Sequence, residues 1–242
     1  MVAHIDRCLG CRACEAVCPS GVEYGTLLET TREHIERNYQ RSPWQTLLRR
    51  VFIEQVVPYP GRMKLALLPV RIAQALGLGR LLPALTPTKI SATPVPEFSP
   101  AVGERRGRVG FVRGCVQSVM FGDTNAATVR LLNRAGYDVV TPPDQGCCGA
   151  LFSHSGNLSE ARVCARHNVE VFGREKLDAI VINAAGCGST LKEYGHLLGT
   201  DEGREFSHKV KDLSEILPSA TGKSAKKVTF HDACHQIGRA HV

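Results

Sequence analysis

The sequence lacks an apolar run of the roughly 18 residues that a membrane-spanning helix needs. Its most hydrophobic part is interrupted by basic residues, namely Arg49, Arg50, Arg62, Lys64, Arg71 and Arg80. It also lacks a secretory signal, because Met1 is followed almost at once by Asp6, Arg7 and a run of cysteines. We therefore expect a cytoplasmic protein, in which closely spaced cysteines are metal ligands or redox groups rather than disulfides.

Aromatic residues are scarce, at 6% of the chain, and the basic residues are scattered rather than clustered. Both features argue against a nucleic-acid partner, despite a net charge of +7. The positive charge suits docking to acidic partners or to anionic lipid, so a peripheral membrane association stays open. A chain of 242 residues with 43% apolar content is long enough for one full domain and a smaller one.

Cysteine is plentiful, with ten residues in the chain. Cys8, Cys11, Cys14 and Cys18, followed by Pro19, have the C-x2-C-x2-C-x3-C-P spacing of a bacterial [4Fe-4S] ferredoxin. In two-cluster ferredoxins the last of these cysteines ligates the other cluster, so we expect Cys18 to serve a second cluster whose remaining ligands would precede Met1. The sequence is therefore expected to be truncated at its N-terminus. Structural zinc is the alternative, although zinc sites usually hold two well-separated C-x2-C pairs.

Composition divides the chain into segments: a cysteine segment at 1–40, a helical extension at 41–82, a proline-rich linker at 83–105, an α/β domain at 106–226 and the start of another domain at 227–236. The cysteine loop leads into a helix from Tyr24 to Gln40. Prolines cut the extension into short helices, and those between Leu82 and Pro100 rule out regular structure there.

The predicted strands of the α/β domain are Val109–Val112, Tyr137–Val140, Ala179–Ile182 and Lys227–Phe230. The predicted helices are Thr124–Ala135, Leu158–Lys176, Ser189–Leu198 and Arg204–Leu217. Strands that alternate with helices predict a parallel sheet. The fold class is thus α+β overall, with a small helical [4Fe-4S] segment followed by an α/β domain whose sheet is mainly parallel.

A second set of cysteines follows the predicted strands: Cys115, the pair Cys147 and Cys148, Cys187, and Cys234. Ligands gather at the carboxyl ends of the strands in an open α/β sheet, so this placement predicts a shared metal or redox site at one edge. The simpler alternative is a set of buried free thiols. Cys164 falls in the middle of a predicted helix and is expected to be a small core residue.

Several segments resemble the iron–sulfur subunits of bacterial glycolate oxidases. They are Cys8-Leu-Gly-Cys-Arg-Ala-Cys-Glu-Ala-Val-Cys-Pro, Gly-Cys115-Val-Gln, Gly-Cys147-Cys148-Gly-Ala and Asn183-Ala-Ala-Gly-Cys187-Gly. The family carries two ferredoxin-type motifs followed by two cysteine-rich CCG domains. The resemblance implies that this chain holds the second ferredoxin motif, the first CCG domain at 106–226, and the opening of a second CCG domain at His231-Asp-Ala-Cys-His235. Residues 237–242 resemble a translated sequencing-library adapter and are expected to be a non-native tail.

The resemblance implies an electron-transfer subunit of an oxidoreductase complex, with no catalytic residue of its own. A partner flavin subunit, carrying FAD, would oxidise glycolate to glyoxylate, and the [4Fe-4S] clusters would pass the electrons toward membrane quinone at the cytoplasmic face of the inner membrane. Related reductases end the CCG pattern with C-x-x-C, but Thr190 stands at the last position here. A further iron–sulfur centre on Cys115, Cys147, Cys148 and Cys187 therefore stays open, with Cys234 assigned to the second CCG domain.

Three alternatives remain at this point. The same kind of subunit serves lactate or glycerol 3-phosphate oxidation in related proteins. A heterodisulfide-reductase-like protein would instead carry out thiol–disulfide chemistry at the CCG centre. A zinc-stabilised interaction module is the third alternative.

Overall fold

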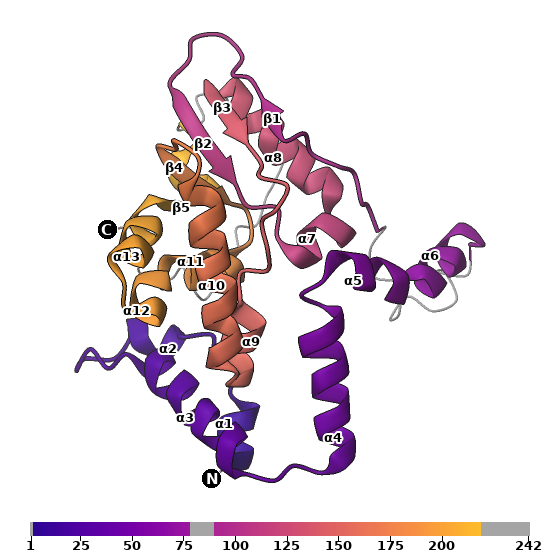
Figure 1. The fold of residues 1–242 in the computed structure, drawn as a ribbon, viewed down its shortest axis with the longest axis vertical. Helices are drawn as coiled ribbons and strands as arrows, with labels where there is room; N and C mark the ends of the chain where they lie inside the picture. Colours follow the sequence, from indigo (N-terminus) through magenta and orange to yellow (C-terminus); the bar gives the residue numbers. More distant parts are fainter. Residues whose placement is uncertain (1, 78–89, 219–242) are drawn as a thin grey trace.

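The computed structural model describes residues 2–77 and 90–218. An open sheet and its covering helices form the upper part of the view in Figure 1, and the N-terminal helices lie below them, beside the helices that follow the third strand. None of the described helices combines the length and the apolar content that crossing a bilayer requires. The predicted strand at 227–230, the segment 227–236 with Cys234, and the tail 237–242 lie outside the described residues.

The N-terminal part is helical throughout. Its elements are α1 (Val2–Arg7), α2 (Ala13–Ala16), α3 (Tyr24–Asn38), α4 (Pro43–Leu48), the π-helix η1 (Arg49–Val56), α5 (Pro60–Ala66) and α6 (Leu68–Ala75). The structure confirms the helix expected from Tyr24 as α3 and the short helices expected in the extension. Proline favours the first turn of a helix, and Pro43 begins α4 behind a Ser42 side chain that caps the Gln45 N–H.

The sheet contains five strands in the order β1-β3-β2-β4-β5. They are β1 (Phe98–Ser99), β2 (Gly107–Phe111), β3 (Tyr137–Val140), β4 (Ala179–Ile182) and β5 (Val210–Asp212). β2, β3, β4 and β5 pair in parallel, and β1 lies antiparallel to β3 at one edge. The prediction of a mainly parallel sheet in a mixed α/β chain is therefore confirmed.

Helices cover both faces of this sheet. They are α7 (Cys115–Met120), α8 (Gly122–Arg134), α9 (Ala150–Ser155), α10 (Leu158–Gly173), α11 (Ala185–Lys192), α12 (Tyr194–Leu198), α13 (Asp201–Lys209) and α14 (Leu213–Ile216). Side chains alternate between the faces of a strand, so Val181 packs with Leu132 of α8 on one side while Ile182 packs with α10, α12 and α13 on the other. The thiol-bearing segments lie on the second side.

Two short strands were missed from the sequence. The predicted helix Arg204–Leu217 is wrong in its centre, because α13 ends at Lys209 and Val210 pairs with Ile180 of β4. Burial of Val210 and the ladder bonds to β4 outweigh the local helical pattern. β1 lies inside the segment in which prolines were expected to exclude regular structure, and that expectation is wrong at Phe98 and Ser99 because an edge strand tolerates nearby prolines.

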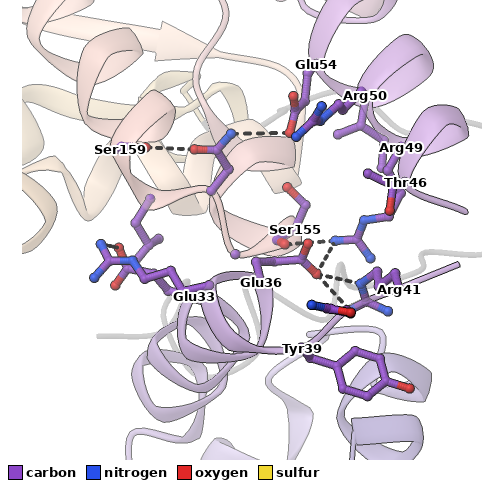
Figure 2. A pocket seen from close by; sticks show the side chains of 16 residues that line it. Glu33, Glu36, Tyr39, Arg41, Thr46, Arg49, Arg50, Glu54, Ser155 and Ser159 are labelled. Atoms are coloured by element: carbon purple, nitrogen blue, oxygen red, sulfur yellow. Dashed lines mark hydrogen bonds and ion pairs between the residues drawn. The ribbon is translucent and has the colours of Figure 1, made fainter. Parts of the chain in front are cut away.

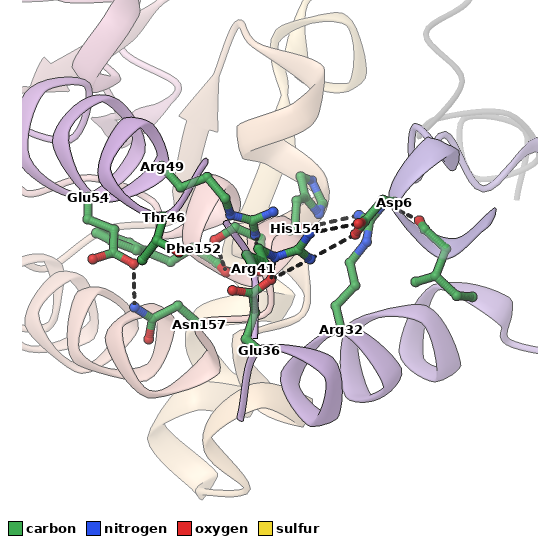
Figure 3. A network of polar contacts seen from close by, with 12 residues as sticks. Asp6, Arg32, Glu36, Arg41, Thr46, Arg49, Glu54, Phe152, His154 and Asn157 are labelled. Carbon is green, nitrogen blue, oxygen red and sulfur yellow. Dashed lines mark hydrogen bonds and ion pairs between the residues drawn. The ribbon is translucent and has the colours of Figure 1, made fainter. Parts of the chain in front are cut away.

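A polar seam joins the N-terminal helices to α9. The Arg32 guanidinium of α3 donates to the carbonyl of His154 at 2.8 Å and to the carbonyl of Ile5 at 3.0 Å. Figure 3 shows Arg41 reaching from the α3–α4 turn to Asp6, and this hydrogen bond lowers the pKa of the Asp6 carboxyl. A single set of guanidinium groups therefore fixes α1 and α3 against the α/β domain.

The seam borders a polar pocket of about 500 Å³ between α3, η1 and the α9–α10 turn. In Figure 2, Glu36 lies between Arg41 and Arg49, while Glu54 of η1 accepts a hydrogen bond from Asn157. Arg49 also donates to the carbonyl of Ser155 at 2.9 Å. Acidic and basic side chains alternate around this pocket, and their ion pairs and hydrogen bonds connect the N-terminal helices to the α9–α10 turn.

The layer arrangement predicts a large difference between two adjacent leucines of α8. Leu132 is 0% exposed against the sheet, whereas Leu131 is 45% exposed. Leu132→Ala is expected to lower the free energy of unfolding by about 2–5 kcal/mol, because it removes buried apolar contacts and leaves a cavity. Urea denaturation followed by circular dichroism measures the change.

Leu131→Ala is the matched control, with an expected loss within about 1 kcal/mol. Equal losses in the two variants would contradict the assignment of Leu132 to the core.

Candidate functional site

Four strand-end cysteines meet at the carboxyl edge of the sheet, as expected. Cys115 begins α7 after β2, Cys147 and Cys148 lie in the loop between β3 and α9, and Cys187 lies on α11 after β4. Cys115 Sγ donates to Cys147 Sγ at 3.7 Å. Cys148 contacts both Cys147 and Cys187. The four thiols therefore form one contiguous group, here called the thiol cluster.

Cys164 also belongs to the thiol cluster, which the sequence did not indicate. It packs against the core as expected, but its thiol also forms a hydrogen bond with Cys147. Gly149 makes this approach possible: it has φ +83°, and a Cβ at this position would lie 3.3 Å from Cys164 Cβ. The only sequence signal was the Gly after Cys148, which permits a helix to pack closely.

A buried amide clamps the loop that carries Cys147 and Cys148. Asn168 of α10 accepts from the Gly146 N–H at 3.0 Å and donates to the Cys147 carbonyl at 2.9 Å. Its amide also donates to the Tyr194 hydroxyl, which in turn donates to the Cys148 carbonyl at 2.9 Å. Asn168 and Tyr194 thus hold both cysteines through backbone groups, and this leaves the thiols available for other contacts.

Burial and mutual hydrogen bonds keep most of these thiols protonated. The bond that Cys115 donates to Cys147, together with burial, raises the pKa of Cys115. That bond favours the Cys147 thiolate, but contacts with Cys148 and Cys164 and burial outweigh it, so the pKa of Cys147 is raised. The pKa of Cys148 is raised because its contact with Cys187 and its burial outweigh the bond from Cys147. By contrast, the bond from Cys147 lowers the pKa of Cys164.

The N-terminal cysteines lie in a more open loop. Cys14 is exposed, while Cys8, Cys11 and Cys18 are half-buried. The Gly10 N–H donates to Cys8 Sγ at 3.4 Å. Backbone N–H groups of Val22, Ser20 and Gly21 point at the Cys18 sulfur and lower its pKa. Such concave sets of N–H groups stabilise anionic sulfur.

An ion pair joins this loop to the thiol cluster's side of the α/β domain. Arg12 follows Cys11 directly, and its guanidinium pairs with Glu193, which lies between α11 and α12. Burial opposes the charge on Arg12, but the hydrogen bond to Glu193 outweighs it and raises the pKa of the guanidinium. Because α11 carries Cys187, the two cysteine regions are mechanically connected.

The donor chemistry of both regions fits an iron–sulfur group. Thiolates are the usual ligands of such clusters, and backbone N–H groups directed at sulfur are a common means of tuning them. The Gly149 N–H donates to Cys147 Sγ at 3.4 Å, as the Gly10 N–H does to Cys8. Within residues 2–77 and 90–218, no three His, Cys, Asp or Glu side chains are preset around a single metal ion. The ligand assignments of Cys8, Cys11, Cys14, Cys18, Cys115, Cys147, Cys148 and Cys187 stay predictions.

A cavity of about 550 Å³ opens beside the thiol cluster. Cys115, Cys147 and Cys164 line it, and Arg113 and His167 lie at its wall. Burial lowers the pKa of Arg113, although Glu97 partly opposes this shift. Pro58, Tyr59 and Pro60 of the helical extension also line the cavity. The thiol cluster is therefore reachable from outside through a partly apolar entrance.

Comparison with known proteins gives two family matches. The cysteine-rich CCG domain matches residues 109–192, and the linker region of the glycolate oxidase iron–sulfur subunit matches residues 37–93. The "Probable glycolate oxidase iron-sulfur subunit" of Bacillus subtilis (strain 168) is 37% identical over 98% of this chain. The chain is a homologue of glycolate oxidase iron–sulfur subunits. No solved structure matches it.

Two further relatives are similar to this chain. The "Glycolate oxidase iron-sulfur subunit" of Escherichia coli (strain K12) is 34% identical over 96% of the chain. "Lactate utilization protein A" of Geobacillus sp. (strain WCH70) is 28% identical over 53% of it, and the match spans 58% of that relative. The homologue spans 61% of the length of the Bacillus subtilis subunit and 58% of the Escherichia coli subunit.

The clamp on the cysteine loop predicts the effect of Asn168→Ala. The substitution leaves the Gly146 N–H and the Cys147 carbonyl without their partner, so the free energy of unfolding is expected to fall by about 1–3 kcal/mol. The loop should also open more often, so alkylation of Cys147 and Cys148 should accelerate. Urea denaturation and mass spectrometry of alkylated peptides measure the two effects.

Arg166→Ala, at an exposed position of the same helix, is the control, with an expected change within about 0.5 kcal/mol. Unchanged alkylation in the Asn168 variant would show that the loop does not depend on the clamp.

The raised thiol pKa values predict that the metal-free protein loses stability in alkali. The unfolded chain releases thiol protons near the ordinary value of 9.0, whereas folded Cys115, Cys147 and Cys148 retain theirs. The folded state therefore binds more protons above pH 9.0, and its stability falls as pH rises, by up to about 1.4 kcal/mol per pH unit for each thiol. Cys164, with its lowered pKa, instead makes stability rise with pH at values below 9.0, and it does not affect the fall above that value.

Denaturant titrations at several pH values measure the slope. Cys148→Ala is expected to make the slope shallower by about one proton. A slope unaffected by this substitution would contradict a neutral buried thiol at position 148.

Proposed function

We propose that the chain is the iron–sulfur electron-transfer subunit of a glycolate-oxidising complex, and that it relays electrons from a partner FAD-containing subunit toward membrane quinone. The observation that carries the proposal is the joining of two cysteine regions in one packed unit, through the Arg12–Glu193 ion pair and the Arg32 hydrogen bonds. A relay needs its carriers held at fixed separation, and this arrangement supplies that condition. The similarity to glycolate oxidase subunits over nearly the whole chain supports the substrate.

In this proposal Cys8, Cys11 and Cys14 hold one [4Fe-4S] cluster and Cys18 contributes to a second. Cys115, Cys147, Cys148 and Cys187 hold a further iron–sulfur centre, and Cys234 belongs to the second CCG domain. Such clusters supply one-electron carriers between two-electron flavin chemistry and quinone. The chain itself holds the sulfurs, directs N–H groups at them and excludes water from Cys148, which is 4% exposed.

Glycolate is favoured over lactate and glycerol 3-phosphate by the extent of the similarity. The match to the lactate utilisation relative covers 53% of the chain, whereas the glycolate oxidase matches also include the region 37–93. Thiol–disulfide catalysis is less well supported, because Thr190 occupies the last position of the C-x-x-C pair and its hydroxyl donates to the Gly186 carbonyl.

The surface of the helical extension supports the proposal of a peripheral position at the cytoplasmic face of the membrane. Trp44, Phe52 and Leu65 are exposed there, and Arg50 and Lys64 lie in the same helices. Apolar side chains next to basic ones suit the interface of an anionic bilayer. This surface would bring the relay close to its quinone acceptor.

Anaerobic reconstitution of the chain with ferrous iron and sulfide tests the proposal. We expect acid-labile sulfide in proportion to iron, and an electron paramagnetic resonance signal of reduced [4Fe-4S] after dithionite treatment, both at low occupancy because Cys8, Cys11 and Cys14 supply three of the four ligands of their cluster. Cys11→Ser should lower the iron content and the signal, because it removes a thiolate ligand. With the flavin subunit added, glycolate should bleach the iron–sulfur absorbance faster than lactate or glycerol 3-phosphate does.

Val17→Ala, in the same loop and 79% exposed, is the matched control and should leave the iron content unchanged. Stoichiometric zinc without sulfide would overturn the relay in favour of a zinc-stabilised module. Bleaching by lactate alone would overturn the substrate but not the relay.

A further inference from the structure

We propose that Cys164 is a fifth sulfur donor of the thiol cluster and binds thiophilic metal together with Cys115 and Cys147. The inference deepens the proposed function, because it completes the ligand set of the same centre. It rests on the position of the α10 thiol and on the cavity beside it, neither of which belongs to the CCG sequence pattern.

The first support is the fixed position of Cys164 relative to Cys147. Asn168 lies one helical turn after Cys164 and is hydrogen-bonded to the Cys147 carbonyl at 2.9 Å. The amide thus sets the register of α10 against the cysteine loop, and the same helix face presents the Cys164 thiol to Cys147. The close packing of α10 on Gly149 leaves little freedom for the helix to move away.

The second support is that three of the thiols, including that of Cys164, line the cavity. Cys115, Cys147 and Cys164 line the cavity of about 550 Å³, whereas Cys148 and Cys187 do not. A metal ion or an iron–sulfur precursor that enters from solvent therefore meets Cys164 among the first three thiols. Buried structural cysteines seldom share such an opening, because their thiols are surrounded by apolar atoms.

The third support is that the C-x-x-C pattern, which begins at Cys187, lacks its second cysteine. Thr190 occupies the position of the last cysteine and is 4% exposed, with its hydroxyl already donating to the Gly186 carbonyl at 3.3 Å. It offers no thiolate to the cluster. Cys164 supplies a sulfur from a different element, α10, at the same edge of the sheet.

The chemistry needs no oxidant. The thiols contact one another as S–H donors and acceptors, and metal binding replaces these contacts with metal–sulfur bonds and releases the thiol protons to solvent. The Cys115–Cys147 separation of 3.7 Å is close to the sulfur–sulfur distance of about 3.8 Å that tetrahedral ligation with bonds of about 2.3 Å produces. The three thiols are not already arranged around one metal ion, so the side chains must move for all three to bind it.

Cadmium ion alone serves as the probe, added to the whole, reduced, metal-free chain under anaerobic conditions. N-ethylmaleimide labelling followed by mass spectrometry reads each cysteine separately. We expect cadmium to slow the labelling of Cys164 at least tenfold, together with that of Cys115 and Cys147. Equal labelling of Cys164 with and without cadmium would overturn the proposal.

Cys164→Ser separates ligation from simple closure of the cavity. It should weaken cadmium binding by the thiol cluster about tenfold and reduce the sulfur-to-cadmium charge-transfer absorbance by one thiolate. Val163→Ala, at a neighbouring cavity position that is 50% exposed, should change neither. An unchanged absorbance in the Cys164 variant shows that Cys164 is only shielded, and it overturns the assignment.

The two proposals fail in different ways. If the chain incorporates no iron or sulfide but cadmium protects Cys164, the relay is wrong and the fifth donor stands. If iron and sulfide are incorporated equally by the parent chain and the Cys164→Ser variant, and cadmium leaves Cys164 labelling unchanged, the relay stands and the fifth donor is wrong.

Discussion

The amide of Asn168 is the contact on which the functional edge of the sheet depends. Two adjacent cysteines in an irregular loop would normally have carbonyl and N–H groups exposed to competition from water. Asn168 and the Tyr194 hydroxyl satisfy those groups from within the core, at distances between 2.9 and 3.2 Å. Buried polar groups that are fully paired fix a unique geometry, and here that geometry fixes the loop, α10 and α12 together. The positions of Cys147, Cys148 and Cys164 follow from it.

Several ionic and polar contacts attach the N-terminal helices to the α/β domain. They include the contacts of Arg12, Arg32 and Arg49. Guanidinium groups suit this role, because each provides several donors in a rigid plane and meets carbonyls and carboxylates at once. Glu29 of α3 also contacts the α/β domain. Burial alone would raise the pKa of its carboxyl, but hydrogen bonds with His154 and Ser153 outweigh the burial and lower that pKa.

Sequence patterns predicted the elements whose signals are local. Tyr137–Val140 and Ala179–Ile182 are short apolar runs bounded by turn residues, and both are strands with the predicted bounds. The gathering of Cys115, Cys147, Cys148 and Cys187 followed from the rule for strand ends. β5 was missed because Val210 is its single apolar residue, and its strand conformation depends on pairing with β4. The thiol contact of Cys164 and the pairing of Arg12 with Glu193 arise from packing between distant segments, which leave no periodic trace in the chain.

The backbone conformation of Arg12 couples the N-terminal cysteine loop to the α/β domain. It adopts φ +59°, in the left-handed region that side-chain-bearing residues occupy at a cost of roughly 1–3 kcal/mol. The ion pair with Glu193 offsets that cost only when α11 and α12 are already in place. The shape of the N-terminal cysteine loop therefore depends on a contact with the α/β domain.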